Sequence, residues 1–129
     1  MQCAYCYYLE KGQYSAHRKQ GKLSTELLEK LVRGTIAGSE GPVVSFTWHG
    51  GEPALAGEDF YRRALELQKK YLPQGWQAWN NLQTNGTLLN DKWAKFLKEN
   101  RFDVGVSIDG PASVHDRNRK DRGGKGTWE

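Results

Sequence analysis

The chain has 129 residues and a formal net charge of +4, and 37% of its residues are apolar. This length is typical of one domain, and no stretch approaches the ~20 apolar residues that span a bilayer. Residues 3–14 also lack the apolar core of a secretory signal, so we expect a cytoplasmic protein with no membrane partner. In that compartment a cysteine pair is more typical of metal or redox chemistry than of a disulfide.

Much of the excess positive charge lies in residues 115–122, HDRNRKDR. Basic segments that bind nucleic acid are usually longer or carry interleaved aromatic residues. This segment carries two aspartates and runs into a Gly-Gly pair. We therefore expect a solvated loop or a small-anion site, with His115 as a hydrogen-bonding loop residue, and no nucleic-acid partner.

The first predicted helix is capped by Ser24, extends to about Ala37 and ends at Gly38. Its apolar residues gather on one face: Leu27, Leu28, Leu31 and Val32. A β-rich run over residues 43–48 then predicts a strand. That strand ends at the sequence HGGEP, residues 49–53.

The second predicted helix begins near Glu58 and ends before Pro73. Its apolar residues follow helical spacing: Phe60, Ala64, Leu67 and Tyr71. The next predicted strand covers residues 76–83, although two asparagines lie inside it. It runs into the sequence TNGT, which reads first as a turn.

A third predicted helix is capped by Asn90 and ends near Asn100, and a short strand over residues 104–108 follows it and stops at DGP. The helix carries Trp93, Phe96 and Leu97 on one face. The resulting order α-β-α-β-α-β is typical of a parallel α/β sheet. Right-handed crossovers then place the three strand ends on one edge, where α/β folds hold their active sites.

Two cysteines, Cys3 and Cys6, form a C-x-x-C pattern. A thioredoxin-like pair would lie at a helix N-terminus directly after a strand, but a long polar segment follows Cys6 here. A zinc site needs two further ligands, and the three histidines are scattered. A third cysteine four residues before Cys3 would complete the C-x-x-x-C-x-x-C cradle of an iron–sulfur cluster. The pair alone leaves iron–sulfur, zinc and ordinary thiols open.

The polar sequences at the strand ends each have two interpretations. The Gly-Gly pair at 50–51 forms either a tight turn or a backbone that a ligand can approach closely, and the charge of Glu52 suits an ammonium group. Ser107 and Asp109, with Arg119 nearby, suit either turn chemistry or a ligand that carries a carboxylate and a ribose.

In combination these sequences are more specific: CAYCYY, WHGGEP, QTNGT and SIDGP, followed by HD and Arg119, occur in that order. They resemble the radical S-adenosylmethionine superfamily, and within it the anaerobic sulfatase-maturating enzymes of the SPASM-type group. The resemblance covers Gln2 to Thr127. It implies an α/β fold in which residues 1–129 form part of the core domain, a partial (β/α)6 TIM-like barrel. The first strand, the rest of the barrel and the SPASM-type domain would lie outside the chain.

In that family three cysteines bind a 4Fe-4S cluster, whose open iron takes the amino and carboxylate groups of S-adenosylmethionine. Cys3 and Cys6 match the second and third of these ligands, and the first would precede Met1 by two residues. Thiolates are soft ligands, which suit a low-potential cluster. The resemblance assigns cofactor contacts to Tyr5, Gly50, Gly51, Glu52, Ser107, Asp109 and Arg119. Among these, the tyrosine would face the adenine and the GGE sequence the methionine amino group.

The implied reaction is reductive cleavage of S-adenosylmethionine to a 5′-deoxyadenosyl radical, which oxidises a Cys or Ser of a sulfatase to formylglycine. A flavodoxin or ferredoxin would supply the electron. The alternatives are a SPASM-type maturase of ribosomal peptides and an inactive short binding module. No catalytic residue is expected within the chain, since the general base would lie beyond residue 129, so we expect a truncated piece of a longer enzyme.

Overall fold

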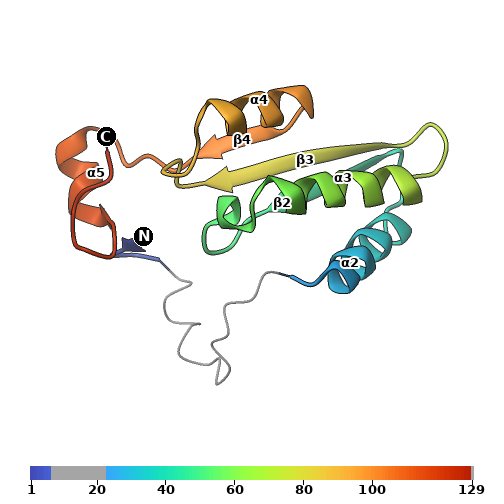
Figure 1. The fold of residues 1–129 in the computed structure, drawn as a ribbon, viewed down its shortest axis with the longest axis horizontal. Coiled ribbons are helices and arrows are strands. Elements are labelled where there is room, and N and C mark those ends of the chain that lie inside the picture. The colour runs from blue at the N-terminus through green and yellow to red at the C-terminus, as the bar shows by residue number, and fades with distance from the viewer. Residues whose placement is uncertain (7–22, 129) are drawn as a thin grey trace, which may run out of the picture.

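The computed structural model describes residues 1–6 and 23–128. Its central sheet has three parallel strands in the order β2 (Val43–Trp48), β3 (Gln77–Thr84) and β4 (Asp103–Val106). The parallel α/β prediction is therefore confirmed (Figure 1). The predicted end of the last strand at residue 108 is wrong, because its partner among the described strands, β3, ends at Thr84.

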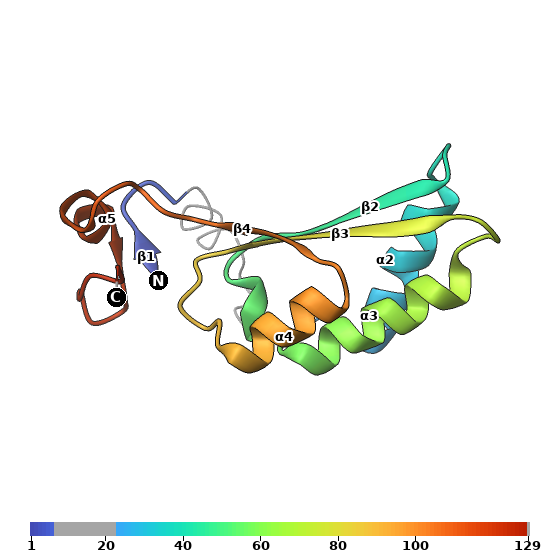
Figure 2. The same ribbon diagram turned by 90° about the horizontal axis from the view of Figure 1, so that it is seen from above.

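Three helices cover one face of this sheet (Figure 2): α2 (Thr25–Ala37), α3 (Glu58–Tyr71) and α4 (Asp91–Glu99). The predicted caps are confirmed. Ser24 accepts a hydrogen bond from the Leu27 N–H at 3.2 Å, and Asn90 accepts one from the Trp93 N–H at 3.0 Å. Each cap satisfies an N–H group that has no partner inside its own helix.

The buried face of α2 differs from the prediction in part. Leu28 and Val32 are buried together with Ile36, whereas Leu27 and Leu31 are 53% and 43% exposed. Residues four apart form one line along a helix. The line through residues 28, 32 and 36 faces the core, so the neighbouring line turns outward.

Aromatic rings form the centre of the core around Tyr61 of α3. It meets four rings nearly edge-on, with centroids 5.2–5.9 Å away: Trp48, Phe60, Trp93 and Phe102. Edge-to-face contact is the arrangement that aromatic quadrupoles favour. The hydroxyl of Tyr61 donates to the Pro53 carbonyl at 2.9 Å. It thereby ties the short 3-10 helix η1 (Pro53–Ala56) to α3.

A buried amide pair explains how an asparagine fits inside β3. Asn80 and Gln68 are only 4% and 2% exposed. Their side chains exchange two hydrogen bonds of 2.9 and 3.0 Å, and the Trp48 ring N–H also donates to the Asn80 oxygen at 2.9 Å. Every group in this network therefore has a partner, as a buried polar group needs.

The end of the chain folds back beside its beginning. Helix α5 (Ala112–Asn118) leads into β5 (Arg119–Lys120), which pairs antiparallel with β1 (Gln2–Cys3) beyond the end of β4 (Figures 1 and 2). The loop alternative predicted for residues 115–122 is therefore wrong for residues 115–120, which lie in α5 and β5. The short strand at the cysteines was also not predicted, because its partner lies at the other end of the sequence.

No helix among the described residues is long and apolar enough to cross a membrane.

Candidate functional site

Hydrogen bonds join the polar sequences at the strand ends to one another. Glu52, which follows β2, accepts hydrogen bonds from the end of β3. Gln83 in β3 donates to Ser107, which follows β4. Asp109 accepts from Tyr5, which lies between the two cysteines. Four segments that are distant in the sequence therefore meet at one edge of the sheet, as right-handed crossovers predict for the strand ends.

The Glu52 carboxylate links the end of β2 to the end of β3 by hydrogen bonds. One oxygen accepts hydrogen bonds from the Thr84 hydroxyl at 2.6 Å and the Ala54 N–H at 3.0 Å, and the other accepts from the Asn85 N–H at 2.9 Å. An ionised carboxylate has about four acceptor positions. Three of these positions are used by donors among the described residues, which leaves one for a further donor.

The two glycines before this carboxylate have a backbone conformation that side chains rarely adopt. Gly50 has a φ of 102° and Gly51 a φ of 58°. A Cβ atom built on Gly51 would meet no heavy atom within 4 Å. The demand for glycine at 51 therefore comes from the left-handed backbone rather than from crowding, and the backbone stays open to a ligand.

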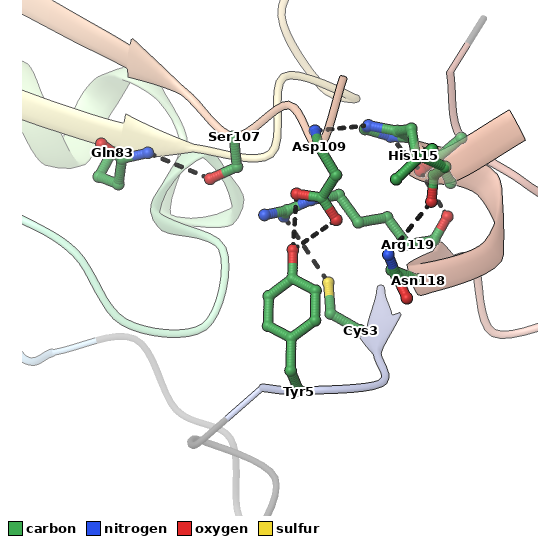
Figure 3. A network of polar contacts seen from close by, with 10 residues as sticks. Cys3, Tyr5, Gln83, Ser107, Asp109, His115, Asn118 and Arg119 are labelled. Atoms are coloured by element: carbon green, nitrogen blue, oxygen red, sulfur yellow. Dashed lines mark hydrogen bonds and ion pairs between the residues drawn. The ribbon is translucent and has the colours of Figure 1, made fainter. Parts of the chain in front are cut away.

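Gln83 lies over β4 and reaches toward the third strand end (Figure 3). Its amide nitrogen donates to the Ser107 hydroxyl at 3.1 Å. A Cβ atom on Gly105 would stand 2.2 Å from the Gln83 side-chain oxygen, so this glycine makes the space that the amide fills. The sequence predicts a ligand contact for Ser107. For Gln83 it predicts only a position at the end of a strand, before a turn.

The cysteines lie in a compact turn. The Cys6 N–H donates to the Cys3 carbonyl at 3.1 Å, and the Ala4 N–H donates to the Asn118 carbonyl at 2.9 Å, which fixes the turn against α5. Both thiols are free and partly buried. Soft thiolates suit iron–sulfur clusters and zinc. Among residues 1–6 and 23–128, no group of three or more His, Cys, Asp or Glu side chains could hold a metal ion, so a further ligand would be needed.

An ion pair lies directly beside the cysteine turn. Arg119 Nε donates to Asp109 Oδ1 at 2.8 Å, and the Tyr5 hydroxyl lies 2.7 and 2.6 Å from the two carboxylate oxygens. The Arg119 guanidinium carbon is 5.4 Å from the centre of the Tyr5 ring, and its Nη1 is 3.8 Å from Cys3 Sγ. Figure 3 shows the Arg119 side chain beside the Asp109 carboxylate, with a dashed line from its guanidinium to the Cys3 sulfur.

These contacts set the charges of the three groups. The hydrogen bond from Tyr5, followed by that from Arg119, lowers the pKa of Asp109. Burial and the hydrogen bond to Asp109 raise the pKa of Tyr5. Burial alone would lower the pKa of Arg119, but its hydrogen bond to Asp109 and the neighbouring Tyr5 raise it overall. Near neutral pH the group therefore holds a neutral phenol, a carboxylate and a guanidinium.

His115 is buried in α5, with 4% of its surface exposed, rather than lying in a loop as predicted. The Asp109 N–H donates to its Nδ1 at 3.5 Å, and its Nε2 lies 3.2 Å from the Thr127 hydroxyl. That hydroxyl donates to the Arg119 carbonyl at 3.0 Å. Sequence reasoning misses Thr127, because no local pattern connects it to these residues.

A cavity of about 250 Å³ opens beside these groups. It is lined by Asn85, Gly86, Thr87, Val106, Ser107, Ile108, His115, Thr127 and Trp128. Ligand sites usually range from about 300 to 1,000 Å³, so the cavity would hold only part of a cofactor or substrate. It lies where the ends of β3 and β4 meet the segment after β5.

The cysteine turn and the partly buried arginine–carboxylate pair lie at the strand ends of a parallel sheet, the edge at which α/β barrels place their active sites. The family model described as the radical SAM (S-adenosylmethionine) superfamily matches residues 1–129. The chain therefore belongs to the radical SAM superfamily.

The similar proteins include sulfatase-maturating enzymes of two types. A serine-type anaerobic sulfatase-maturating enzyme of Bacteroides thetaiotaomicron is 50% identical over 123 residues, which are 95% of this chain and 30% of the relative. A cysteine-type enzyme of Clostridium perfringens is 42% identical over 128 residues, 99% of this chain and 34% of the relative. The chain thus spans about a third of the length of these curated relatives.

Solved structures match over nearly the whole chain. The structure described as "Native anSMEcpe with bound AdoMet" has a TM-score of 0.86 and 41% identity, and it covers 98% of this chain and 34% of its own. A second, with bound AdoMet and a Cp18Cys peptide, has a TM-score of 0.83 and 41% identity over 99% of this chain and 33% of its own. These matches confirm the predicted partial TIM-like barrel.

Proposed function

We propose that this edge of the sheet binds S-adenosylmethionine beside a 4Fe-4S cluster, and that the protein containing this chain oxidises a Cys or Ser of a sulfatase to formylglycine. The observation that carries the proposal is the linked set of strand-end groups, from Glu52 through Ser107 to the Asp109–Arg119 pair. The names of the similar enzymes support the choice of substrate.

The cysteine turn would hold the cluster. Cys3 and Cys6 would supply two thiolate ligands, and a third thiolate would come from outside this sequence, which holds two cysteines. When bound, the cluster and cofactor would supply a radical that abstracts a hydrogen atom from the substrate. Arg119 would add positive charge beside the cluster, since its Nη1 lies 3.8 Å from Cys3 Sγ.

The remaining side chains would orient the cofactor. Arg119 uses Nε for Asp109, so its other N–H groups are donors suited to the methionine carboxylate, together with the Ser107 hydroxyl. The open backbone at residues 50–51 and the remaining acceptor position of Glu52 would receive the methionine amino group. Tyr5 would stand beside the adenine, with its hydroxyl held by Asp109.

The partners follow from the same proposal. Since both serine-type and cysteine-type enzymes are similar to the chain, either residue could be the oxidised one. A flavodoxin or ferredoxin as the reductant, and a cytoplasmic location, stay predictions.

Anaerobic reconstitution of the full protein that contains this chain tests the proposal. We expect cluster absorbance, S-adenosylmethionine cleavage to 5′-deoxyadenosine, and formylglycine in sulfatase peptides that carry Cys or Ser, detected by mass spectrometry. Cys3→Ala and Cys6→Ala should each abolish all three signals, whereas the matched control Ser113→Ala, at an exposed position of α5, should keep them.

The other outcomes decide between the alternatives. Cofactor cleavage without oxidation of either peptide would contradict sulfatase maturation and favour a maturase of ribosomal peptides. A protein that takes up neither iron nor cofactor would contradict the whole proposal and favour a binding module.

A further inference from the structure

We propose that His115 is a positioning residue for the cofactor site. It acts through the Thr127 hydroxyl to keep Asp109 and Arg119 in the positions in which their side chains pair. The inference rests on the proposed function of this edge, because Asp109 and Arg119 face the cysteine turn. It concerns the buried ring of His115 and a threonine for which the sequence predicts no role.

The His115 ring connects the two ends of the segment 109–119. The Asp109 N–H donates to Nδ1, and Nε2 meets the Thr127 hydroxyl, which itself donates to the Arg119 carbonyl. The imidazole and the hydroxyl therefore bridge the backbone before α5 to the backbone after it. The side chains of the same two residues form the 2.8 Å ion pair.

The donors and acceptors along this bridge define one tautomer. A carbonyl only accepts, so the single hydroxyl proton of Thr127 must go to Arg119. The Thr127 oxygen then has only lone pairs left for the ring, so Nε2 carries the hydrogen. A neutral ring in this form has a lone pair on Nδ1, which matches the N–H that Asp109 directs at it.

The surroundings hold the bridge in place. The Trp128 ring packs edge-on against His115 with centroids 5.5 Å apart. The Trp128 N–H donates to an Asp116 carboxylate oxygen at 3.0 Å, which anchors the backbone next to Thr127. The Thr127 hydroxyl therefore meets the imidazole from a backbone that is anchored at the next residue. Loss of this hydroxyl should leave the fold of α5 but loosen the Asp109–Arg119 segment.

Substitution of the threonine separates the hydrogen bond from packing. Thr127→Val keeps the volume but leaves the buried ring N–H without an acceptor, whereas Thr127→Ser keeps the hydroxyl. For Thr127→Val we expect amide exchange in the 109–119 segment to speed up on the order of tenfold, the effect of losing about one net hydrogen bond. Exchange read by mass spectrometry should be near wild type in Thr127→Ser and in the control Thr35→Val on α2.

Equilibrium binding of S-adenosylhomocysteine to the reconstituted full protein provides the second measurement. Thr127→Val should weaken binding by roughly tenfold, Thr127→Ser should restore most of it, and Thr35→Val should leave it unchanged. Equal impairment by Ser and Val would show that the methyl group matters rather than the hydroxyl, and would overturn the proposal. Wild-type affinity and exchange in Thr127→Val would overturn it as well.

These outcomes are distinct from failure of the proposed function. If the wild-type protein binds no cofactor analogue, the proposed cofactor site is wrong, and the positioning role falls with it. The exchange measurement needs no cofactor, so it still reports whether the His115–Thr127 bridge exists.

Discussion

At the scale of single residues, the Asp109 carboxylate connects parts of the chain that the sequence keeps far apart. Its partner Tyr5 is 104 positions away, and Arg119 is ten positions away. The sequence alone leaves turn chemistry and a ligand contact open for this strand-end acid, and the family resemblance assigns it a cofactor contact. Its position between the phenol and the guanidinium makes it the group that holds the cysteine turn against the third strand end.

Replacement of this carboxylate by an amide should give a pH-dependent loss of stability. The hydrogen bonds from Tyr5 and Arg119 lower the pKa of Asp109 from its ordinary value of 3.8. A lowered pKa means that the ionised group stabilises the fold above that value, and that this contribution disappears as the pH falls through the folded-state pKa. Asp109→Asn should therefore be less stable than wild type near neutral pH, with a difference that shrinks in acid below pH 3.8.

Urea unfolding at a series of pH values measures this difference. Asp59→Asn, at an exposed position in the first turn of α3, serves as the control and should show a smaller effect. A stability gap for Asp109→Asn that stays constant from neutral pH into acid would contradict the interpretation.

At the scale of elements, local patterns predict most of what forms. The capped starts of α2 and α4 and the extent of β2 agree with the sequence because caps and apolar spacing act within a few residues. The misplaced end of β4 has a different origin, since a strand extends only as far as its neighbour. The Asn80 position in β3 is another such case, because its partners Gln68 and Trp48 come from α3 and β2.

The buried amide network gives a prediction for β3. Asn80→Leu should lower the free energy of unfolding by about 2 kcal/mol or more, because the Gln68 amide and the Trp48 ring N–H lose their buried partner. The double variant Asn80→Leu with Gln68→Leu should recover part of that loss, since both amides are then replaced.

Denaturant unfolding of these variants tests this network. The control Asn81→Leu changes the neighbouring residue, whose side chain reaches the exposed Ser45 at 3.3 Å, and should alter stability by less than about 1 kcal/mol. Equal losses in the free energy of unfolding for Asn80→Leu and Asn81→Leu would show that the buried amide network does not contribute to stability.

At the scale of the whole molecule, the described helices α2, α3 and α4 cover one face of the sheet (Figure 2). On strands β2 and β3 the side chains of Val43 and Trp79 are 56% and 53% exposed. Within the described residues, β2 and β4 are edge strands. Exposed apolar surface and unpaired edges favour association.

We therefore expect the 129-residue chain by itself to be oligomeric or poorly soluble. Val43→Lys, which places a charge on the β2 edge, should reduce association, whereas Leu55→Lys should have less effect. Leu55 is 64% exposed but lies on η1 rather than on a strand. Size-exclusion chromatography over a range of concentrations is the measurement, and a monomeric wild-type chain with cooperative unfolding would contradict the expectation.

By itself, the sequence determined the α/β class, most helix and strand positions and the polar residues at the strand ends. These depend on interactions between near neighbours, which leave a periodic pattern in the chain. Only the tertiary structure decided that β1 pairs with β5, that Tyr5 meets Asp109, and that Thr127 links His115 to Arg119. Such contacts arise when the folded path of the chain brings distant donors and acceptors together, and no local pattern encodes that path.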